Sequence, residues 1–273
     1  MSVAVSGDAA GFGHGTRTAL APSTFSIPAA KVTAVIGPNG AGKSTLLNGI
    51  AGLIRPYEGT IRVAAERARI SYVLQTTKVN DALPISVIEV VMMGRYARTG
   101  AYRWINDADR SAAGEAMDRM GIAGLAGRQL KDLSAGERQR VFVAQGLAQE
   151  HDLLLLDEPM TGVDLPTAQA IDAVIHDEIG RGCTVVLTTH DLSEAQVADN
   201  VMLLAGRVVA CGPPDEALRA ENIRSAYGAA LLHAQDGRVF LDDAAHSHET
   251  ERHVHRDMSI HTEADPEGFH GRR

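Results

Sequence analysis

The spacing of apolar residues divides most of the chain into segments typical of strands and segments typical of helices. Short runs rich in β-branched and apolar residues predict strands. Their ranges are 24–30, 31–37, 59–65, 69–75, 152–159 and 183–190. Apolar spacings of three and four predict helices within 84–149 and over 166–180. Residues 201–214 have the pattern of a hairpin, and residues 214–228 that of a last helix.

Strands that alternate with helices predict an α/β fold whose sheet is mostly parallel. The hairpin adds an antiparallel β part, and the helical block, about residues 76–149, is interpreted as an inserted helical subdomain. We expect a single domain over residues 1–241. From residue 242 the sequence becomes polar and rich in histidine, which predicts a disordered tail over 242–273.

Composition narrows the classes of function. The 273 residues hold 34 Asp and Glu against 26 Lys and Arg, and this formal net charge of -8 argues against nucleic acid as a partner. No apolar run is long enough to cross a bilayer, and the first residues lack the pattern of a secretory signal, so we expect a cytoplasmic protein. Cys183 and Cys211 lie in apolar segments and are predicted to be reduced core residues.

The sequence GPNGAGKST at 37–45 fits the phosphate-binding loop pattern G-x-x-x-x-G-K-[ST], after a predicted strand and before a predicted helix. Glycines let backbone N–H groups turn towards phosphate oxygens, and the helix N-terminus adds positive potential. Lys43 is expected to contact the β- and γ-phosphates, and Ser44 to place its hydroxyl on Mg²⁺. The residues predicted to bind the nucleotide here are Gly37, Pro38, Asn39, Gly40, Ala41, Gly42, Lys43, Ser44 and Thr45.

Four leucines at 153–156 predict a fully buried parallel strand that ends at two acidic residues. Asp157 is expected to hold Mg²⁺ through water. Glu158 is expected to act as the general base that polarises the attacking water. Without the phosphate loop, the same Asp-Glu pair would also suit the start of a helix.

Five motifs follow the order and spacing found in ABC-transporter ATPase subunits, and the chain resembles this family over about residues 10–220. They are the phosphate loop, LSAGERQR at 133–140, LLLLDEP, TGVD and TTHD. The second motif, the signature, has Ala135 and Glu137 where the common form has glycine and glutamine. The resemblance implies the ABC ATPase fold of the P-loop NTPases, ATP and Mg²⁺ as ligands, and ATP hydrolysis coupled to transmembrane transport.

The signature also predicts a local structure. Ser134 and Glu137 fit an S-x-x-E capping box that starts a helix. Together with Gly136, this capped helix end is expected to present hydrogen-bond donors to a γ-phosphate. In the family, that phosphate belongs to ATP bound by the other subunit. The resemblance therefore implies a head-to-tail homodimer that ATP binding closes and hydrolysis reopens.

Other roles are carried over by resemblance, position by position. Gln75 matches the glutamine that reaches Mg²⁺ and the attacking water, and His190 matches the histidine that contacts the γ-phosphate. Asp164 matches the aspartate that spans the dimer interface. The adenine is normally stacked by an aromatic residue upstream of the phosphate loop; in register that position is His14, and Phe12 is the alternative, which the sequence leaves open.

The resemblance also implies partners and a cargo. We expect separate membrane permease subunits that insert a short helix near residues 76–84, a substrate-binding protein that acts indirectly, and a position on the inner face of the cell membrane. Within the family, the segments 86–100, 128–149 and 153–164 look most like ATPases of Mn/Zn-type metal importers. A zinc importer of the Azt type is the specific expectation. A manganese importer, an iron-siderophore or haem importer, and a non-transport ABC ATPase are the alternatives.

The tail contains two H-x-H pairs, His246 with His248 and His253 with His255. Neutral imidazole is a good ligand for zinc, whereas manganese prefers oxygen ligands. The tail is therefore predicted to sense or buffer zinc, with a solvated tail of no function as the alternative of equal weight. In neither interpretation does the tail belong to the ATPase site.

Overall fold

The computed structural model describes residues 2–15, 17–75, 84–96 and 105–228, with the side chain of His14 excepted, and the backbone of 231–233 and 239–241. Residues Met1–Asp242 form one compact unit. The expected permease loop at 76–84, apart from its last residue, and the histidine-rich tail lie outside the described residues, so both stay predictions. No helix in the described part of the chain is long and apolar enough to cross a membrane.

A six-stranded sheet forms the centre of this unit, in the order β5-β6-β7-β3-β8-β9. The first five strands are parallel, and β9 pairs with β8 in the antiparallel hairpin that the sequence predicts. All residues of β6, β7 and β8 are buried, as the leucine run of β6 indicates. The strands are β3 (Val32–Ile36), β5 (Ile70–Val73), β6 (Leu153–Leu156), β7 (Thr184–Thr189), β8 (Asn200–Leu204) and β9 (Val208–Gly212).

A second, antiparallel sheet has the order β2-β1-β4. Its members are β1 (Val3–His14), β2 (Arg17–Pro28) and β4 (Glu58–Val63). The sequence does not predict β1, because its segment SGDAAGFGH is rich in Gly and Ala, which have low strand propensity. Pairing with two neighbouring strands overrides that propensity, and the ladder is irregular near Ala9, whose φ is 46°. A short pair, β10 (Leu231–His233) and β11 (Val239–Leu241), is also antiparallel.

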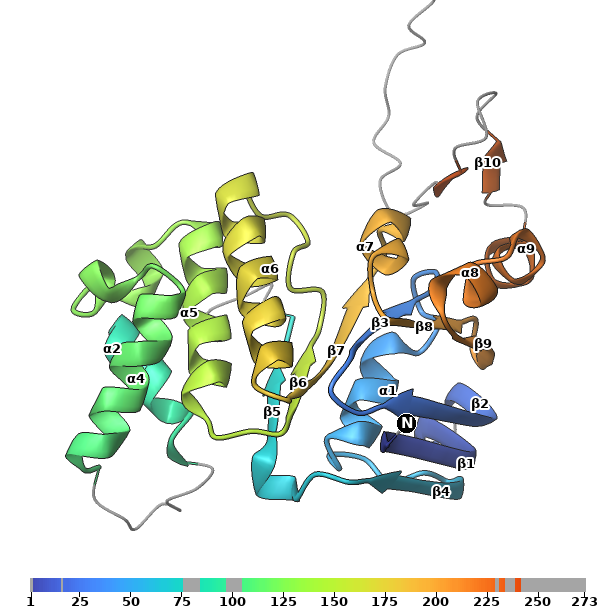
Figure 1. Cartoon of the computed structure of the whole chain (residues 1–273), viewed down its shortest axis with the longest axis horizontal. Helices are drawn as coiled ribbons and strands as arrows, with labels where there is room; N and C mark the ends of the chain where they lie inside the picture. Colours follow the sequence, from blue (N-terminus) through green and yellow to red (C-terminus); the bar gives the residue numbers. More distant parts are fainter. Residues whose placement is uncertain are drawn as a thin grey trace, which may run out of the picture. The chain divides into compact units, whose positions relative to one another are not determined.

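The helices surround the central sheet (Figure 1). The inserted helical block contains α2 (Val87–Met93), α4 (Asp107–Arg119) and α5 (Ala135–Ala148), as its apolar spacing predicts. The remaining helices are α1 (Lys43–Ile50), α6 (Leu165–Gly180), α7 (Leu192–Gln196), α8 (Pro214–Ala217) and α9 (Ala220–Tyr227). Within the described ranges, single turns of 3-10 helix occur at Arg67–Arg69, Ala123–Leu125 and Leu130–Asp132.

The single last helix expected over 214–228 is wrong, because the segment breaks into α8 and α9. Arg219 is extended at the break, with ψ of 144°. The side-chain amide of Asn222 donates to the carbonyl oxygens of Glu216 and Ala217 at 3.1 and 3.2 Å. These bonds satisfy carbonyl groups that a continuous helix would have paired, which stabilises the break.

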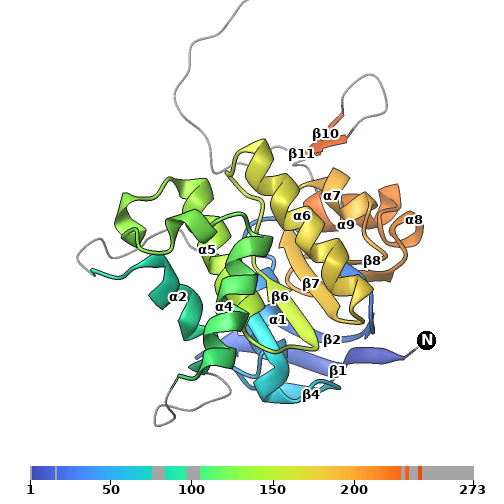
Figure 2. The ribbon, with the colours of Figure 1, turned by 60° about the vertical axis from the view of Figure 1, so that its left-hand side comes forward.

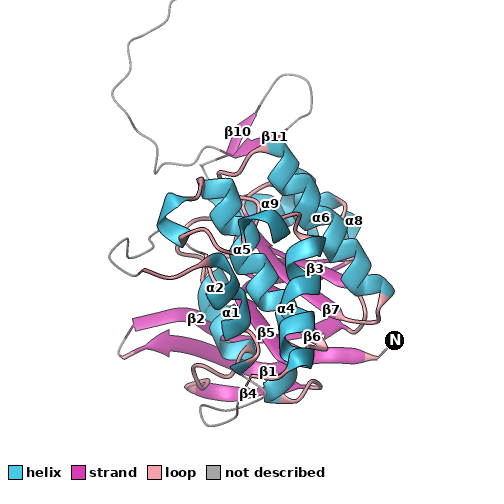
Figure 3. Cartoon of the chain, turned by 90° about the vertical axis from the view of Figure 1, so that its left-hand side faces the viewer, coloured by secondary structure: helices cyan, strands magenta, loops and turns pink. Residues whose placement is uncertain are grey.

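The two faces of the central sheet pack into two separate hydrophobic clusters. In β6, Leu154 and Leu156 belong to the cluster formed with α2, α4, α5 and α6, whereas Leu153 and Leu155 belong to the cluster formed with α1 and the antiparallel sheet. Side chains of a strand alternate between faces, so one short strand contributes to both. Figures 2 and 3 show the helices of the first cluster gathered on one side of the strands. The mixed α/β fold, with a parallel sheet, an antiparallel part and a helical insertion, is confirmed.

Candidate nucleotide site

The predicted nucleotide residues come together because parallel strands end at the same edge of a sheet. Gln75 follows β5, Asp157 follows β6, and His190 follows β7 directly. The phosphate loop follows β3, which pairs with β7. Ligands of open α/β sheets bind outside the carboxyl ends of their strands, and these four segments define that edge here.

The phosphate loop has the backbone that its glycines permit. Gly40 and Gly42 have φ of 79° and 99°, in the left-handed region that favours glycine. Gly37 is needed for a different reason, because a Cβ there would lie 2.2 Å from the carbonyl oxygen of Leu204 in β8. Of the three glycines, Gly37 therefore packs the loop against the sheet, while the other two shape its turn.

Helix α1 begins with its N–H groups uncapped. Gly42 offers no side-chain cap, and the first turn holds no acidic residue. Four N–H groups at a helix start have no partner within the helix, so this end is suited to an anion such as a phosphate. Ser44 is exposed in this first turn, and Thr45 is partly buried. The loop and helix start therefore fit the phosphates of a nucleotide.

Lys43 is buried, with 6% of its side chain exposed, and its ammonium group has polar partners within the site. Its ammonium group donates to the carbonyl oxygen of Gly37 at 2.9 Å and lies 3.9 Å from Oε1 of Glu158. A buried cation requires such partners, since desolvation would otherwise be costly. The structure thus brings the loop lysine and the predicted general base together.

Glu158 is held from two directions. Its Oε2 accepts a hydrogen bond of 2.8 Å from the side-chain amide of Gln75, and its backbone N–H donates to the Thr188 hydroxyl at 2.8 Å. Its φ of 48° is strained for a non-glycine residue, and such strain is kept only where the surroundings fix it. About 15% of the carboxylate side chain is exposed, so it remains accessible to a water molecule.

Thr188 is a site residue that sequence reasoning missed. Its hydroxyl, wholly buried in β7, donates to Oδ1 of Asp157 at 2.6 Å while accepting from the N–H of Glu158. One side chain therefore fixes both acidic residues. The available signal was its place as the first residue of the TTHD motif, directly after the apolar run at 185–187. Nearby, burial and the negative charge of Asp157 raise the pKa of Tyr72 above its usual range.

His190 lies at the exposed end of β7, where the TTHD motif places it. Its Nδ1 is 3.5 Å from the hydroxyl of Thr161, which belongs to the TGVD motif. Asp164, from the same motif, caps α6 by accepting from the N–H of Thr167 at 3.1 Å. Hydrogen bonding with Thr167 lowers the pKa of the Asp164 carboxyl. Asp164 thus has a structural role within one chain, in addition to any role at an interface.

The signature forms the capping box that its sequence predicts. The N–H of Ser134 donates to Glu137 Oε2 at 2.8 Å, and the N–H of Glu137 donates to the Ser134 hydroxyl at 3.2 Å. The first of these bonds contributes most to lowering the pKa of Glu137. A Cβ at Gly136 would lie 2.8 Å from Thr167 Oγ1, so glycine lets the start of α5 approach α6. Ser134 and Ala135 are exposed.

One of the two candidates for adenine stacking is excluded. Phe12 is fully buried, and its ring packs so closely on α1 that a Cβ at Gly49 would lie 2.4 Å from it. Its ring faces are therefore unavailable to a nucleotide. His14 is the last residue of β1, and its side chain lies outside the described residues, so its contact with adenine stays a prediction.

Cys183 and Cys211 are both free thiols, as expected.

The phosphate loop lies between a strand and a helix, and an acidic pair lies beside it at the end of a buried parallel strand. These two features together define a P-loop nucleotide hydrolase. The pattern of the ABC transporter family matches residues 20–161. The chain is 41% identical over 208 residues to the zinc transport system ATP-binding protein TroB of Treponema pallidum, covering 74% of this chain and 78% of TroB. It is 37% identical over 226 residues to the manganese transport system ATP-binding protein MntB of Bacillus subtilis, covering 81% and 90%.

The fold agrees with this assignment. The solved structure of CbiO1 from Clostridium perfringens, part of the ABC transporter complex CbiONQ, superposes with a TM-score of 0.67 at 26% identity, covering 82% of this chain and 94% of that one. The chain belongs to the ABC transporter family, as an ATP-binding subunit that hydrolyses ATP.

Proposed function

We propose that this chain is the ATPase subunit of a membrane importer for a transition metal, with zinc as the cargo. The observation that carries the ATPase part is the contact network of Lys43, Gln75 and Glu158 at the mouth of the phosphate loop. The likeness to the zinc and manganese ATP-binding proteins supports the metal part. The sequence features of the Azt type and the histidine pairs of the tail favour zinc over manganese.

The chemistry follows from the acidic pair. Glu158, fixed by Gln75 and the Thr188 hydroxyl, is placed to accept a proton from the water that attacks the γ-phosphate. Lys43 and the N–H groups at the start of α1 stabilise the phosphate oxygens as charge develops on them. The Lys43 ammonium lies 3.9 Å from the Glu158 carboxylate, so the two opposite charges partly offset each other within the site.

The donors at this edge also fit Mg²⁺, which prefers oxygen ligands. Ser44 has an exposed hydroxyl, and Asp157 has its Oδ1 engaged by Thr188. With Gln75, these residues would hold the ion. When bound, Mg²⁺ neutralises charge on the phosphates. The chain itself orients both carboxylates: the Thr188 hydroxyl holds that of Asp157, and the Gln75 amide holds that of Glu158.

We further propose that two copies act together. The capping box of the signature lies on a different helix from the phosphate loop, with Ser134 exposed and Gly136 and Glu137 partly exposed. Such a helix start can bind the γ-phosphate of ATP held by a second copy. Contacts through the shared ATP exist only when the dimer is closed, so hydrolysis removes them and reopens it.

Permease subunits are the partners that an ATPase of this family needs for transport, and they would keep it on the inner face of the membrane. Residues 76–84 are the proposed docking segment, and a substrate-binding protein delivers the metal from outside. His246, His248, His253 and His255 are proposed to bind zinc near the transporter. An iron-siderophore or haem cargo is the alternative to zinc and manganese.

The test is ATP-driven metal uptake by vesicles that contain the chain, its permease and its binding protein. Zinc and manganese are offered separately, and Glu158→Gln serves as the control without hydrolysis. Zinc-selective uptake that the control lacks is the expected result. Manganese uptake would overturn the cargo but keep the importer, whereas ATP hydrolysis with neither metal moved would transfer the proposal to the chelated-iron alternative.

A further inference from the structure

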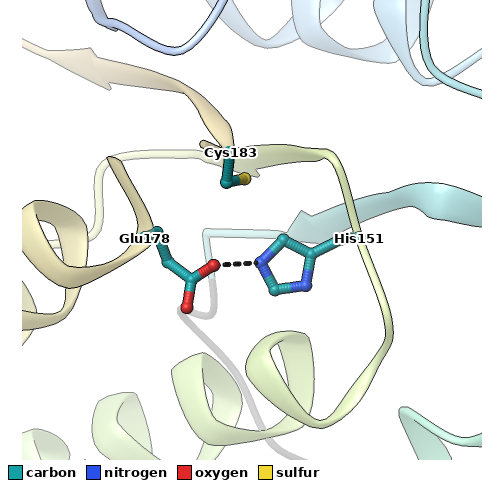
Figure 4. A group of neighbouring side chains, drawn as sticks. All are labelled: His151, Glu178 and Cys183. Carbon is teal, nitrogen blue, oxygen red and sulfur yellow. Dashed lines mark hydrogen bonds and ion pairs between the residues drawn. The ribbon is translucent and has the colours of Figure 1, made fainter. Parts of the chain in front are cut away.

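A cavity of about 350 Å³ opens at the edge of the central sheet opposite the nucleotide site. Among the residues that line it, His151, Glu178 and Cys183 bring metal-binding side chains together (Figure 4). All three are buried: the side chains of His151 and Glu178 are 5% and 4% exposed, and Cys183 is 4% exposed. The nucleotide chemistry uses none of the three, and they differ in type, so they are not a simple acidic cluster.

The fold explains why these residues meet. His151 lies in the turn between α5 and β6, and Cys183 lies just before β7. Because β6 and β7 are neighbouring parallel strands, the residues before them share one edge of the sheet. Glu178 points to the same place from the last turn of α6, the helix that leads into β7. Each residue therefore belongs to, or adjoins, a regular element.

The distances suit a small tetrahedral ion. One ligand atom from each residue, the imidazole nitrogen, a carboxylate oxygen and the thiol sulfur, lies within 4.8 Å of the others. Around Zn²⁺, tetrahedral ligands with ordinary bond lengths are about 3.4–3.6 Å apart. His151 Nε2 and Glu178 Oε2 are 3.0 Å apart. Side-chain movements of about 1 Å or less would therefore complete a three-ligand site.

The surroundings orient the ligands as in a metal site. His151 Nδ1 is 2.6 Å from the carbonyl oxygen of Gln149, so this nitrogen carries a proton, and Nε2 faces Glu178. Arg119 donates to Oε1 of Glu178 at 2.6 Å, which leaves Oε2 towards His151. A histidine fixed by a backbone carbonyl and a carboxylate fixed on its second oxygen are the usual supports of protein-bound metals.

We propose that His151, Glu178 and Cys183 bind one Zn²⁺ ion, with water from the cavity as the fourth ligand. A thiolate with an imidazole selects zinc-like metals, whereas Mn²⁺ prefers oxygen ligands. Glu178 is already paired with Arg119, so the Cys183 thiolate is the ligand that adds negative charge to offset part of the ion's charge. The thiol of Cys183 and the imidazole lose protons when the ion binds. This site is separate from the ATP site and from the tail.

The test uses Co²⁺ as a spectroscopic substitute for zinc in the full-length, reduced chain without nucleotide. Tetrahedral Co²⁺ bound by a thiolate absorbs in the near ultraviolet by charge transfer, a signal that histidines or carboxylates alone do not give. We expect one Co²⁺ per chain to produce this band and one equivalent of Zn²⁺ to remove it. Cys183→Ala should lose the band, and Cys211→Ala, the matched variant of the other free thiol, should keep it.

Two further variants separate the core from the tail and from misfolding. A chain with His246, His248, His253 and His255 replaced by Ala should keep the band at full intensity. Cys183→Ser, which keeps the volume, should lose it with a melting temperature close to wild type when no metal is present. A band that is absent from the wild type, or that persists in either Cys183 variant, overturns the proposal. ATPase activity measured without zinc does not depend on the outcome, so failure here leaves the proposed function untouched.

Discussion

The bridge from Thr188 to both acidic residues makes this side chain the most informative one to change. Thr188→Val keeps the shape of a buried β-branched side chain but removes its hydroxyl. Two hydrogen bonds disappear. One is the bond of 2.6 Å that the hydroxyl donates to Asp157, and the other is the bond of 2.8 Å that it accepts from the N–H of Glu158. The strained backbone of Glu158, with φ of 48°, then loses its nearest support.

The magnitude follows from the kind of bond. A hydrogen bond to an ionised group contributes about 1.5–3 kcal/mol, and the loss of a partner by the part-buried N–H of Glu158 adds about 0.5–1 kcal/mol. We expect Thr188→Val to lower the free energy of unfolding by about 2–4 kcal/mol in total. At about 2–4 °C per kcal/mol for a chain of this size, the melting temperature falls by about 4–16 °C. If the bond to the carboxylate also orients the transition state, kcat falls about 10–100-fold.

The matched control is Thr184→Val at the other end of the same strand. Thr184 is also buried, but its hydroxyl accepts only the N–H of Ala30, at 3.0 Å, far from the acidic pair. This variant should lose about 1 kcal/mol of stability and keep kcat. The assay is phosphate release at saturating ATP, below the melting temperature of each variant. Equal kcat in wild type and Thr188→Val, with the stability loss observed, would refute the positioning role.

The other predictions concern the base, the loop, the tail and acid stability. Glu158→Gln should bind ATP, lose nearly all turnover and elute as a dimer with ATP in size-exclusion chromatography; steady-state hydrolysis near wild type would remove Glu158 from its role. Gly37→Ala should fail to fold or melt far below wild type, since its Cβ would lie 2.2 Å from Leu204 O. Deleting residues 245–273 should leave basal ATPase activity intact but change its response to zinc, measured by phosphate release across a zinc titration. Burial would raise the pKa of Asp199, but hydrogen bonds from Lys31 and the Val32 N–H lower this pKa from its usual 3.8. The ionised carboxylate therefore stabilises the fold above that pH, and this stabilisation is lost as the pH falls through the lowered pKa. In urea unfolding, Asp199→Asn should be less stable than wild type at pH 6, and the difference should shrink as the pH falls below 3.8.

The sequence predicted the motifs well because each needs few residues in a fixed local context. The leucine run of β6 and the glycines of the phosphate loop are signals of this kind. The strand β1 was missed because its Gly- and Ala-rich segment is held by neighbours on both sides, β2 and β4, which no local pattern reveals. Phe12 could not be placed for the same reason, since its burial against Gly49 depends on how β1 meets α1.

Thr188 and the His151 cluster were missed for a related reason, and together they show how the fold uses two strands. At the carboxyl end of β7, a hydroxyl reaches across to the residues that follow β6. At the opposite end, Cys183 before β7 and His151 before β6 meet in the same way. Both groups join residues about 30 positions apart in the sequence, and in both the parallel pairing of β6 with β7 makes them neighbours. A sequence motif records residues along one segment, whereas these arrangements exist only between segments, so their chemistry becomes visible only when the register of the two strands is known.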